Sequence, residues 1–156
     1  MNDSVDSHIY TGADGERVPW NARSVGYAAG ITTIKANSLH DHNCFISVVH
    51  HNSITVIEDG AYCYCSSIDH IRLSSSLQTI GVRSFCECRT ITRLELPPTL
   101  HTIKDEGFGY CESLRVIAPQ QQHEPLTLKT IEELAFWSCF KLATIPNLPF
   151  LVTIGP

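Results

Sequence analysis

Cysteine is the residue type in this 156-residue sequence whose spacing first suggests chemistry. Two Cys-x-Cys pairs, Cys63 with Cys65 and Cys86 with Cys88, stand 23 residues apart. If the pairs lie side by side, their four sulfurs could hold a tetrahedral zinc ion, which prefers thiolate ligands. Familiar zinc sites leave two residues between paired cysteines, whereas a gap of one residue directs the side chains to opposite faces of an extended backbone. We therefore expect no metal ion and no cofactor, and we keep a zinc site at Cys63, Cys65, Cys86 and Cys88 as an alternative hypothesis.

Histidine gives the second signal, because half of the eight histidines fall in one short segment. His40, His42, His50 and His51 lie close together there, with Cys44 among them. Imidazoles at this density can bind zinc or change charge near neutral pH. The competing interpretation, which we favour, is an irregular unit at the end of a repeat array.

The composition and the motifs do not indicate an enzyme, a nucleic-acid-binding protein or a membrane protein. The sequence contains no Gly-x-Ser-x-Gly elbow, no His-Glu-x-x-His helix and no glycine-rich phosphate loop, so we predict that the protein is not an enzyme. A net charge of −5 without any basic run argues against nucleic acid and anionic membranes as partners. No apolar run approaches the roughly 20 residues that span a bilayer, and the polar, acidic N-terminus does not resemble a signal peptide. We expect no membrane insertion, leave the localisation open with the cytoplasm as default, and expect free thiols.

The elements that position these residues follow a repeat of 23 residues. A typical unit contains Leu-x-Thr-Ile, a small residue, an aromatic residue, a cysteine and then three or four spaced apolar residues, and the unit at residue 31 is a degenerate copy of this pattern. Units begin near residues 31, 54, 77, 100 and 128, and an incomplete unit begins at 151. One unit cannot bury its own apolar side chains, so neighbouring units must cover one another in a solenoid. The sequence therefore predicts a repeat solenoid over residues 31–156.

Within a unit the pattern predicts mostly β structure. The segment after the cysteine alternates apolar and polar residues and predicts a strand, and Leu-x-Thr-Ile predicts a second, shorter one on the opposite wall. The segment between them suits one short helical turn. Stacked copies would give parallel strand ladders around a core formed by Tyr62, Phe85, Phe108, Phe136, Cys65, Cys88, Cys111 and Cys139. Cys63 and Cys86 stand where other units have Gly109 and Trp137, so we expect these two thiols to be exposed.

Two stretches resemble the BspA-like class of leucine-rich repeats. They are Ser84-Phe85-x-x-Cys88-x-x-Ile91-x-x-Leu94-x-Leu96-Pro97 and Ala135-Phe136-x-x-Cys139-x-x-Leu142-x-x-Ile145-Pro146. The resemblance implies a curved leucine-rich-repeat solenoid of short parallel strands that serves in recognition or adhesion and has no catalytic residues. The sequence departs from this pattern in its first unit, where His42 replaces the cysteine and His50 the terminal leucine.

Residues 1–30 lie outside the period. Two apolar patches flank an Asp-Gly turn signal there, which predicts a β-hairpin that caps the first unit. A partly ordered leader is the alternative.

The predicted binding surface is the outward face of the longer strands. Alternation places His70, Arg72, Arg93, Glu95 and Val116 on it, and these residues differ between units while the inward positions do not. Such variation on a regular frame is typical of a protein-binding surface, so we predict a protein partner. The alternatives are a solvated face without a partner and a structural fragment of a longer array. The uncapped C-terminal edge at Leu151 and Ile154 also predicts self-association.

Overall fold

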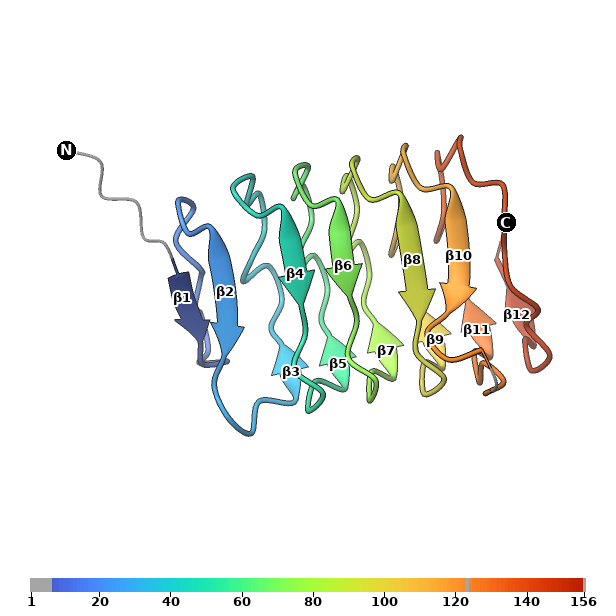
Figure 1. The fold of residues 1–156 in the computed structure, drawn as a ribbon, viewed down its shortest axis with the longest axis horizontal. Helices are drawn as coiled ribbons and strands as arrows, with labels where there is room; N and C mark the ends of the chain where they lie inside the picture. Colours follow the sequence, from blue (N-terminus) through green and yellow to red (C-terminus); the bar gives the residue numbers. More distant parts are fainter. Residues whose placement is uncertain (1–6, 123, 156) are drawn as a thin grey trace.

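The fold is a flattened solenoid whose coils follow one another along the long axis (Figure 1). The computed structural model describes residues 7–122 and 124–155. One wall is a six-stranded parallel sheet of two-residue strands in the order β12-β11-β9-β7-β5-β3. These strands are β3 (Thr33–Ile34), β5 (Val56–Ile57), β7 (Thr79–Ile80), β9 (Thr102–Ile103), β11 (Thr130–Ile131) and β12 (Thr153–Ile154). In every pair the isoleucines are in register, so they form a single column of β-branched side chains, which is buried from Ile34 to Ile103 and exposed at Ile154.

The opposite wall carries longer strands, which pair two by two. These strands are β1 (Ser7–Tyr10), β2 (Ser24–Tyr27), β4 (Ser47–Val49), β6 (His70–Arg72), β8 (Arg93–Leu96) and β10 (Val116–Pro119). β1 pairs with β2, β4 with β6 and β8 with β10, all in parallel. The parallel-strand solenoid predicted from the period is confirmed.

An aromatic stack runs through the core from coil to coil. The ring centroids of Tyr62 and Phe85 lie 5.0 Å apart, those of Phe85 and Phe108 5.1 Å, and those of Phe108 and Phe136 5.6 Å, with planes within 4° of parallel. The first three rings have no exposed surface, whereas Phe136 is partly buried. Because each ring covers the next, the stack couples neighbouring coils.

A column of cysteines lies beside the aromatic stack. Each thiol donates a hydrogen bond to a backbone carbonyl of the preceding coil, at sulfur–oxygen distances of 3.0 Å for Cys65, 3.2 Å for Cys88, 3.3 Å for Cys111 and 3.2 Å for Cys139. Burial raises the pKa of the Cys65 thiol to about 12 and that of Cys139 to about 11. These thiols therefore remain protonated and act as small buried donors.

The short helical turn predicted between the two strands takes a different form. In the third unit the N–H of Cys86 donates to the Arg83 carbonyl (3.1 Å) and the N–H of Cys88 to the Phe85 carbonyl (3.3 Å), which are tight turns. Arg83 and Glu87 have φ angles of 52° and 64°, and left-handed residues at this spacing stop a right-handed helix after one turn. The described residues accordingly contain no helix, and thus none that is long and apolar enough to cross a membrane.

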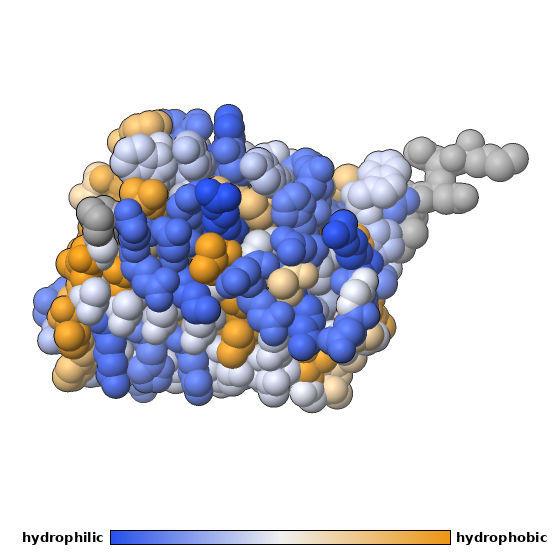
Figure 2. All heavy atoms as spheres, turned by 180° about the vertical axis from the view of Figure 1, so that it is seen from behind, coloured by the Kyte–Doolittle hydropathy of each residue, from blue (hydrophilic) through white to orange (hydrophobic). Residues whose placement is uncertain are grey.

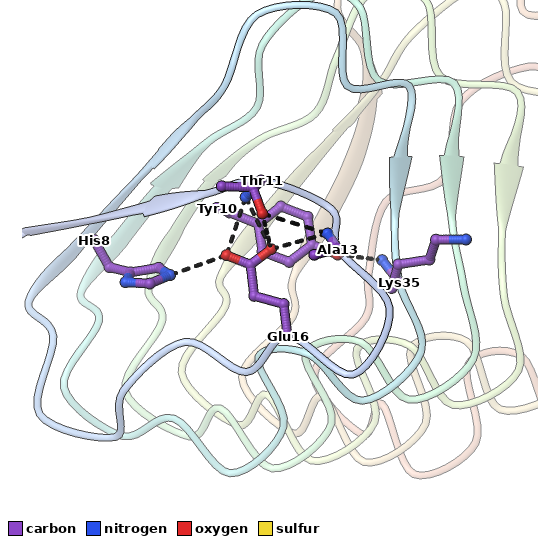
Figure 3. Close-up of polar contacts among 6 residues, drawn as sticks. All are labelled: His8, Tyr10, Thr11, Ala13, Glu16 and Lys35. Atoms are coloured by element: carbon purple, nitrogen blue, oxygen red, sulfur yellow. Dashed lines mark hydrogen bonds and ion pairs between the residues drawn. The ribbon is translucent and has the colours of Figure 1, made fainter.

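The N-terminal segment forms an additional coil, and the predicted β-hairpin is wrong. β1 and β2 run in the same direction, with Ser7 opposite Ser24 and Tyr10 opposite Tyr27. The connection between them crosses to the other wall before the chain returns. The Tyr10 hydroxyl accepts a hydrogen bond of 2.8 Å from the N–H of Lys35, which holds this coil against the first unit (Figure 3).

Glu16 organises the loop that makes this crossing possible. Its carboxylate accepts hydrogen bonds from the N–H and hydroxyl groups of Thr11 at 2.8–3.0 Å, from the N–H of Ala13 at 3.2 Å and from His8 at 3.2 Å (Figure 3). Burial acts to raise the pKa of Glu16, but these hydrogen bonds together lower it below the ordinary value. The carboxylate thus ties together the residues of the loop that follows β1.

Candidate functional site

The outward face of β4, β6, β8 and β10 is the site indicated by the sequence, and we call it the strand face. His70 and Arg72 are exposed on β6, and Ser47 and Val49 of β4 lie opposite them in register. Their spacing is fixed because the intervening Ile71 is buried in the core.

The second half of the strand face is built in the same way. Arg93 of β8 lies opposite Val116 of β10, and Glu95 lies opposite Ala118. Arg93 is exposed, while Glu95, Val116 and Ala118 are half-buried. The structure thus places all five predicted residues on this face, as two parallel pairs of strands rather than one continuous ladder.

The charges of the strand face differ in how well they are paired. Arg93 forms an ion pair with Glu95 at 2.9 Å, and His70 contacts Asp69 at 2.5 Å. Within residues 7–122 and 124–155, Arg72 has no acidic side chain within ion-pair distance. Its guanidinium, with its planar set of donors, is therefore available to a carboxylate from outside.

A depression of about 420 Å³ runs over the middle of this face. Its lining includes Val49, His70, Arg72, Arg93 and Glu95. It lies over β6 and β8, which belong to separate two-stranded sheets. The depression therefore combines an exposed valine with charged groups of both signs.

The two Cys-x-Cys pairs do not bring four sulfurs together. Cys65 and Cys88 point into the core, where they donate to backbone carbonyls. Cys63 and Cys86 line a different depression of about 520 Å³, which we call the thiol hollow. Across the described ranges no three His, Cys, Asp or Glu side chains form a group that could hold a metal ion. The zinc alternative is therefore not formed in this structure.

The expectation that Cys63 and Cys86 are exposed is also wrong. Each residue retains only 5% of its accessible surface, because the turns of neighbouring coils pack around it. The exposed thiol is Cys44, in the first unit.

The dense histidines divide between the core and the surface. His42 stacks on Phe45, with centroids 3.7 Å apart, and its Nε2 hydrogen-bonds the Pro19 carbonyl, so it occupies the place of a ladder cysteine. His40 and His51 are exposed. The four imidazoles do not form a common site.

His50 belongs to a buried polar chain that sequence reasoning missed. Its Nε2 lies 2.8 Å from the Tyr62 hydroxyl, which is in turn 2.9 Å from the Tyr27 hydroxyl. Burial lowers the pKa of His50 to about 3 and raises the pKa of both tyrosines. The sequence did contain a sign of this contact. In the repeat pattern, His50 stands at a position that holds leucine in later units, and Tyr62 stands at a position that holds phenylalanine.

The C-terminal end of the solenoid exposes an apolar surface. Exposed side chains there are Phe140, Ile145, Phe150, Val152 and Ile154. Hydrophobic surface gathers at this end in Figure 2, on the side opposite the N-terminal coil. An apolar cavity of about 360 Å³ lies beneath it, lined by Leu128, Phe136, Trp137, Leu148 and Ile154 among others.

Comparison with known proteins identifies the architecture. The family model of the BspA type leucine rich repeat region matches residues 32–155 in six copies. No curated protein matches the sequence. The chain is similar to a leucine rich cell surface protein from Faecalibacterium prausnitzii, with a TM-score of 0.74 and 24% identity, over 86% of this chain and 36% of that one. It is also similar to a leucine rich repeat protein from T. pallidum, with a TM-score of 0.61 and 17% identity, over 95% of this chain and 78% of that one. At these identities the similarity shows the fold, and the chain spans about a third of the length of the F. prausnitzii protein.

Proposed function

The chain belongs to the BspA type leucine-rich-repeat family, and on that premise we propose that it is a non-catalytic scaffold that binds a protein through its strand face. Members of such repeat families present variable side chains on a regular frame, and the frame supplies a broad surface for another protein. The strand face has this organisation, with buried apolar side chains at Val48, Ile71, Leu94 and Ile117 and changing side chains outside.

The observation that carries this proposal is that Arg72 lies beside Val49 and has no acidic side chain within ion-pair distance among residues 7–122 and 124–155. The two side chains are in register on neighbouring strands, and both are exposed. A carboxylate would form a bidentate contact with the guanidinium, while an adjacent apolar side chain would cover the valine. The partner we propose is therefore a protein with an acidic residue next to an apolar one.

A display library of random peptides, selected on the immobilised full chain, tests this proposal. We expect enriched peptides to pair Asp or Glu with an apolar neighbour. Arg72→Gln should weaken their binding by about tenfold, which corresponds to about 1.4 kcal/mol. The matched control is Arg89→Gln, because Arg89 is also exposed but pairs with Glu87 on the turn side of the coil.

Two results would contradict the proposal. One is the enrichment of peptides that bind the Arg72→Gln variant as strongly as they bind the unmodified chain. The other is the absence of any enriched peptide, which would favour a fragment of a longer array without a partner of its own.

Self-association through the C-terminal end is a second candidate, supported by the apolar surface there. Phe140 and Val152 are 82% and 83% exposed, and the outer edge of β12 has no partner strand among the described residues. Open sheet edges and contiguous apolar patches favour pairing with another chain. We propose that a second copy covers this end.

Light scattering over a wide range of protein concentration tests the second candidate. We expect a concentration-dependent dimer that Val152→Asp converts to a monomer. Trp20→Ser is the control, because Trp20 is an exposed apolar residue of the N-terminal coil. A monomer at all concentrations, or equal effects of both variants, would refute self-association through this end.

A further inference from the structure

Cys63 and Cys86 occupy equivalent positions on neighbouring coils, although the repeat pattern does not require a cysteine there. The N–H of Tyr64 donates to the carbonyl of Cys86 at 2.8 Å, so the backbones touch at this point. The rings of the residues that precede them, Tyr62 and Phe85, stack with centroids 5.0 Å apart, close to the spacing of about 4.8 Å between neighbouring strands. This spacing falls within the Cα separation of about 4.4–6.8 Å that a disulfide tolerates.

The two side chains also leave their backbones in the same direction. Each cysteine N–H closes the same kind of turn, from Cys63 to the Gly60 carbonyl at 3.0 Å and from Cys86 to the Arg83 carbonyl at 3.1 Å. Both thiols line the thiol hollow. The Cys86 thiol donates to Oε2 of Glu106 at 4.0 Å, and the Cys63 and Cys86 thiols shift each other's pKa, as neighbouring groups do.

The surrounding groups shift the pKa values of the two thiols in opposite directions. The neighbouring Cys86 thiol and the positive charge of Arg83 lower the pKa of Cys63 despite its burial. The pKa of Cys86 is raised by the neighbouring Cys63 thiol, by burial and by the carboxylate of Glu106, whose Oε2 lies 4.0 Å from the Cys86 sulfur. Since the thiolate is the nucleophile, Cys63 attacks and Cys86 keeps its proton until the second step.

We propose that Cys63 and Cys86 are a modification site at which a small hydroperoxide forms a reversible disulfide between two coils. The Cys63 thiolate attacks one peroxide oxygen, the O–O bond breaks, and Cys63 becomes a sulfenic acid while hydroxide leaves. Cys86 then loses its proton and attacks the Cys63 sulfur. The S–O bond breaks, the disulfide forms, and the second hydroxide takes up the Cys86 proton as water. Overall, two thiols lose two electrons and two protons, and hydrogen peroxide is reduced to two molecules of water.

Hydrogen peroxide is the probe that fits this site, because each cysteine retains only 5% of its accessible surface. The full chain is treated with a small excess of peroxide and quenched with catalase, and the free thiols are counted after denaturation. We expect the protein to lose two of its seven free thiols and to regain them with dithiothreitol. Mass spectrometry of a non-reduced digest should place the bond between Cys63 and Cys86.

Variants separate the roles of the two thiols. Cys86→Ser should leave Cys63 as a sulfenic acid that dimedone captures as one adduct per chain. Cys63→Ser should give neither a disulfide nor an adduct at position 86. Cys44→Ser is the control, because it removes an exposed thiol. In this variant the disulfide between Cys63 and Cys86 should form as in the unmodified chain.

The proposal is overturned if all seven thiols survive, if the bond involves Cys65 or Cys88, or if dimedone labels position 86 as readily as position 63. Circular dichroism establishes that each variant is folded. If a serine variant does not fold, the peptide map of the unmodified chain still decides, because it reports the linkage directly.

Discussion

Acidification should destabilise this protein through His50, and replacing His50 by leucine should remove most of that effect. The residue is 4% exposed, and its Nδ1 has no hydrogen-bond partner among the described residues. Other units have leucine at the equivalent position, as at Leu73 and Leu96. The substitution therefore fits the repeat pattern, and Tyr62 keeps its hydrogen bond to Tyr27.

The size of the effect follows from the two pKa values of the imidazole. Burial lowers the pKa of His50 to about 3 in the folded protein, whereas an unfolded chain has a value of about 6.5. The unfolded chain thus binds the proton first as the pH falls. The contribution of neutral His50 to stability is complete above pH 6.5 and is lost between pH 6.5 and 3, by about 1.4 kcal/mol per pH unit. At pH 5 the loss amounts to about 2 kcal/mol. Burial lowers the pKa of His42 as well, so a smaller slope of the same sign remains in the variant.

Urea unfolding at pH 7.5 and pH 5.0 measures this difference. We expect the free energy of unfolding to fall by about 2 kcal/mol more in the unmodified chain than in His50→Leu. His101→Gln is the matched control, because it removes a histidine from a position that holds Gln78 in the preceding unit. It should retain the full pH dependence of the unmodified chain.

Equal losses in the unmodified chain and in His50→Leu would refute this reasoning. A complementary measurement is the NMR titration of the His50 ring, whose Hε1 shift should stay constant from pH 7.5 to 4.5. A ring that titrates near pH 6.5 would show that His50 is solvated in the folded state.

Three further predictions concern the packing and backbone conformation of the coils. Chemical denaturation, which gives the free energy of unfolding of each variant, tests all three. Phe108→Ala should reduce the free energy of unfolding by about 3–5 kcal/mol, because it interrupts the ring stack. Gly81→Ala should cost about 1–3 kcal/mol, since the new Cβ would lie 2.7–2.8 Å from backbone atoms of Glu58 and Asp59 in the preceding coil. Ser138→Gly should instead raise the free energy of unfolding by about 0.5–1 kcal/mol, because φ is 58° at this position; an unchanged or lower value would show that no strain is relieved there.

The period of 23 residues predicts the two walls and the core because every inward position recurs in phase. The period does not predict the N-terminal coil. Ser7 pairs with Ser24 there, so paired residues are 17 positions apart in the sequence and not 23. The Asp14-Gly15 signal does mark a turn, but β2, which pairs with β1, begins only at Ser24. A local turn signal cannot report that the later strand runs parallel to the first.

The burial of Cys63 and Cys86 could not be predicted for a related reason. Their equivalents in later units are Gly109 and Trp137, which share no size or polarity, so the sequence gives no estimate of how tightly the turn packs. Packing there depends on the neighbouring coil, including the ion pair of 2.7 Å between Arg83 and Glu106. The pairing of the two thiols is nevertheless implied by their spacing, because residues one period apart are neighbours in any solenoid.

The same rule separates the constraints on this chain into two kinds. A side chain that points inward must fit its equivalents on both sides, so His42 is accommodated only by stacking on Phe45 and bonding to a carbonyl. A side chain that points outward meets its equivalents without having to match them, which allows a valine, an arginine and a glutamate to share one surface. Departures from the pattern inside the core therefore affect stability, as at His50, whereas departures outside it create chemistry. The strand face is an outward place where neighbouring units combine different groups, and the thiol hollow combines such groups around two cysteines that are almost buried.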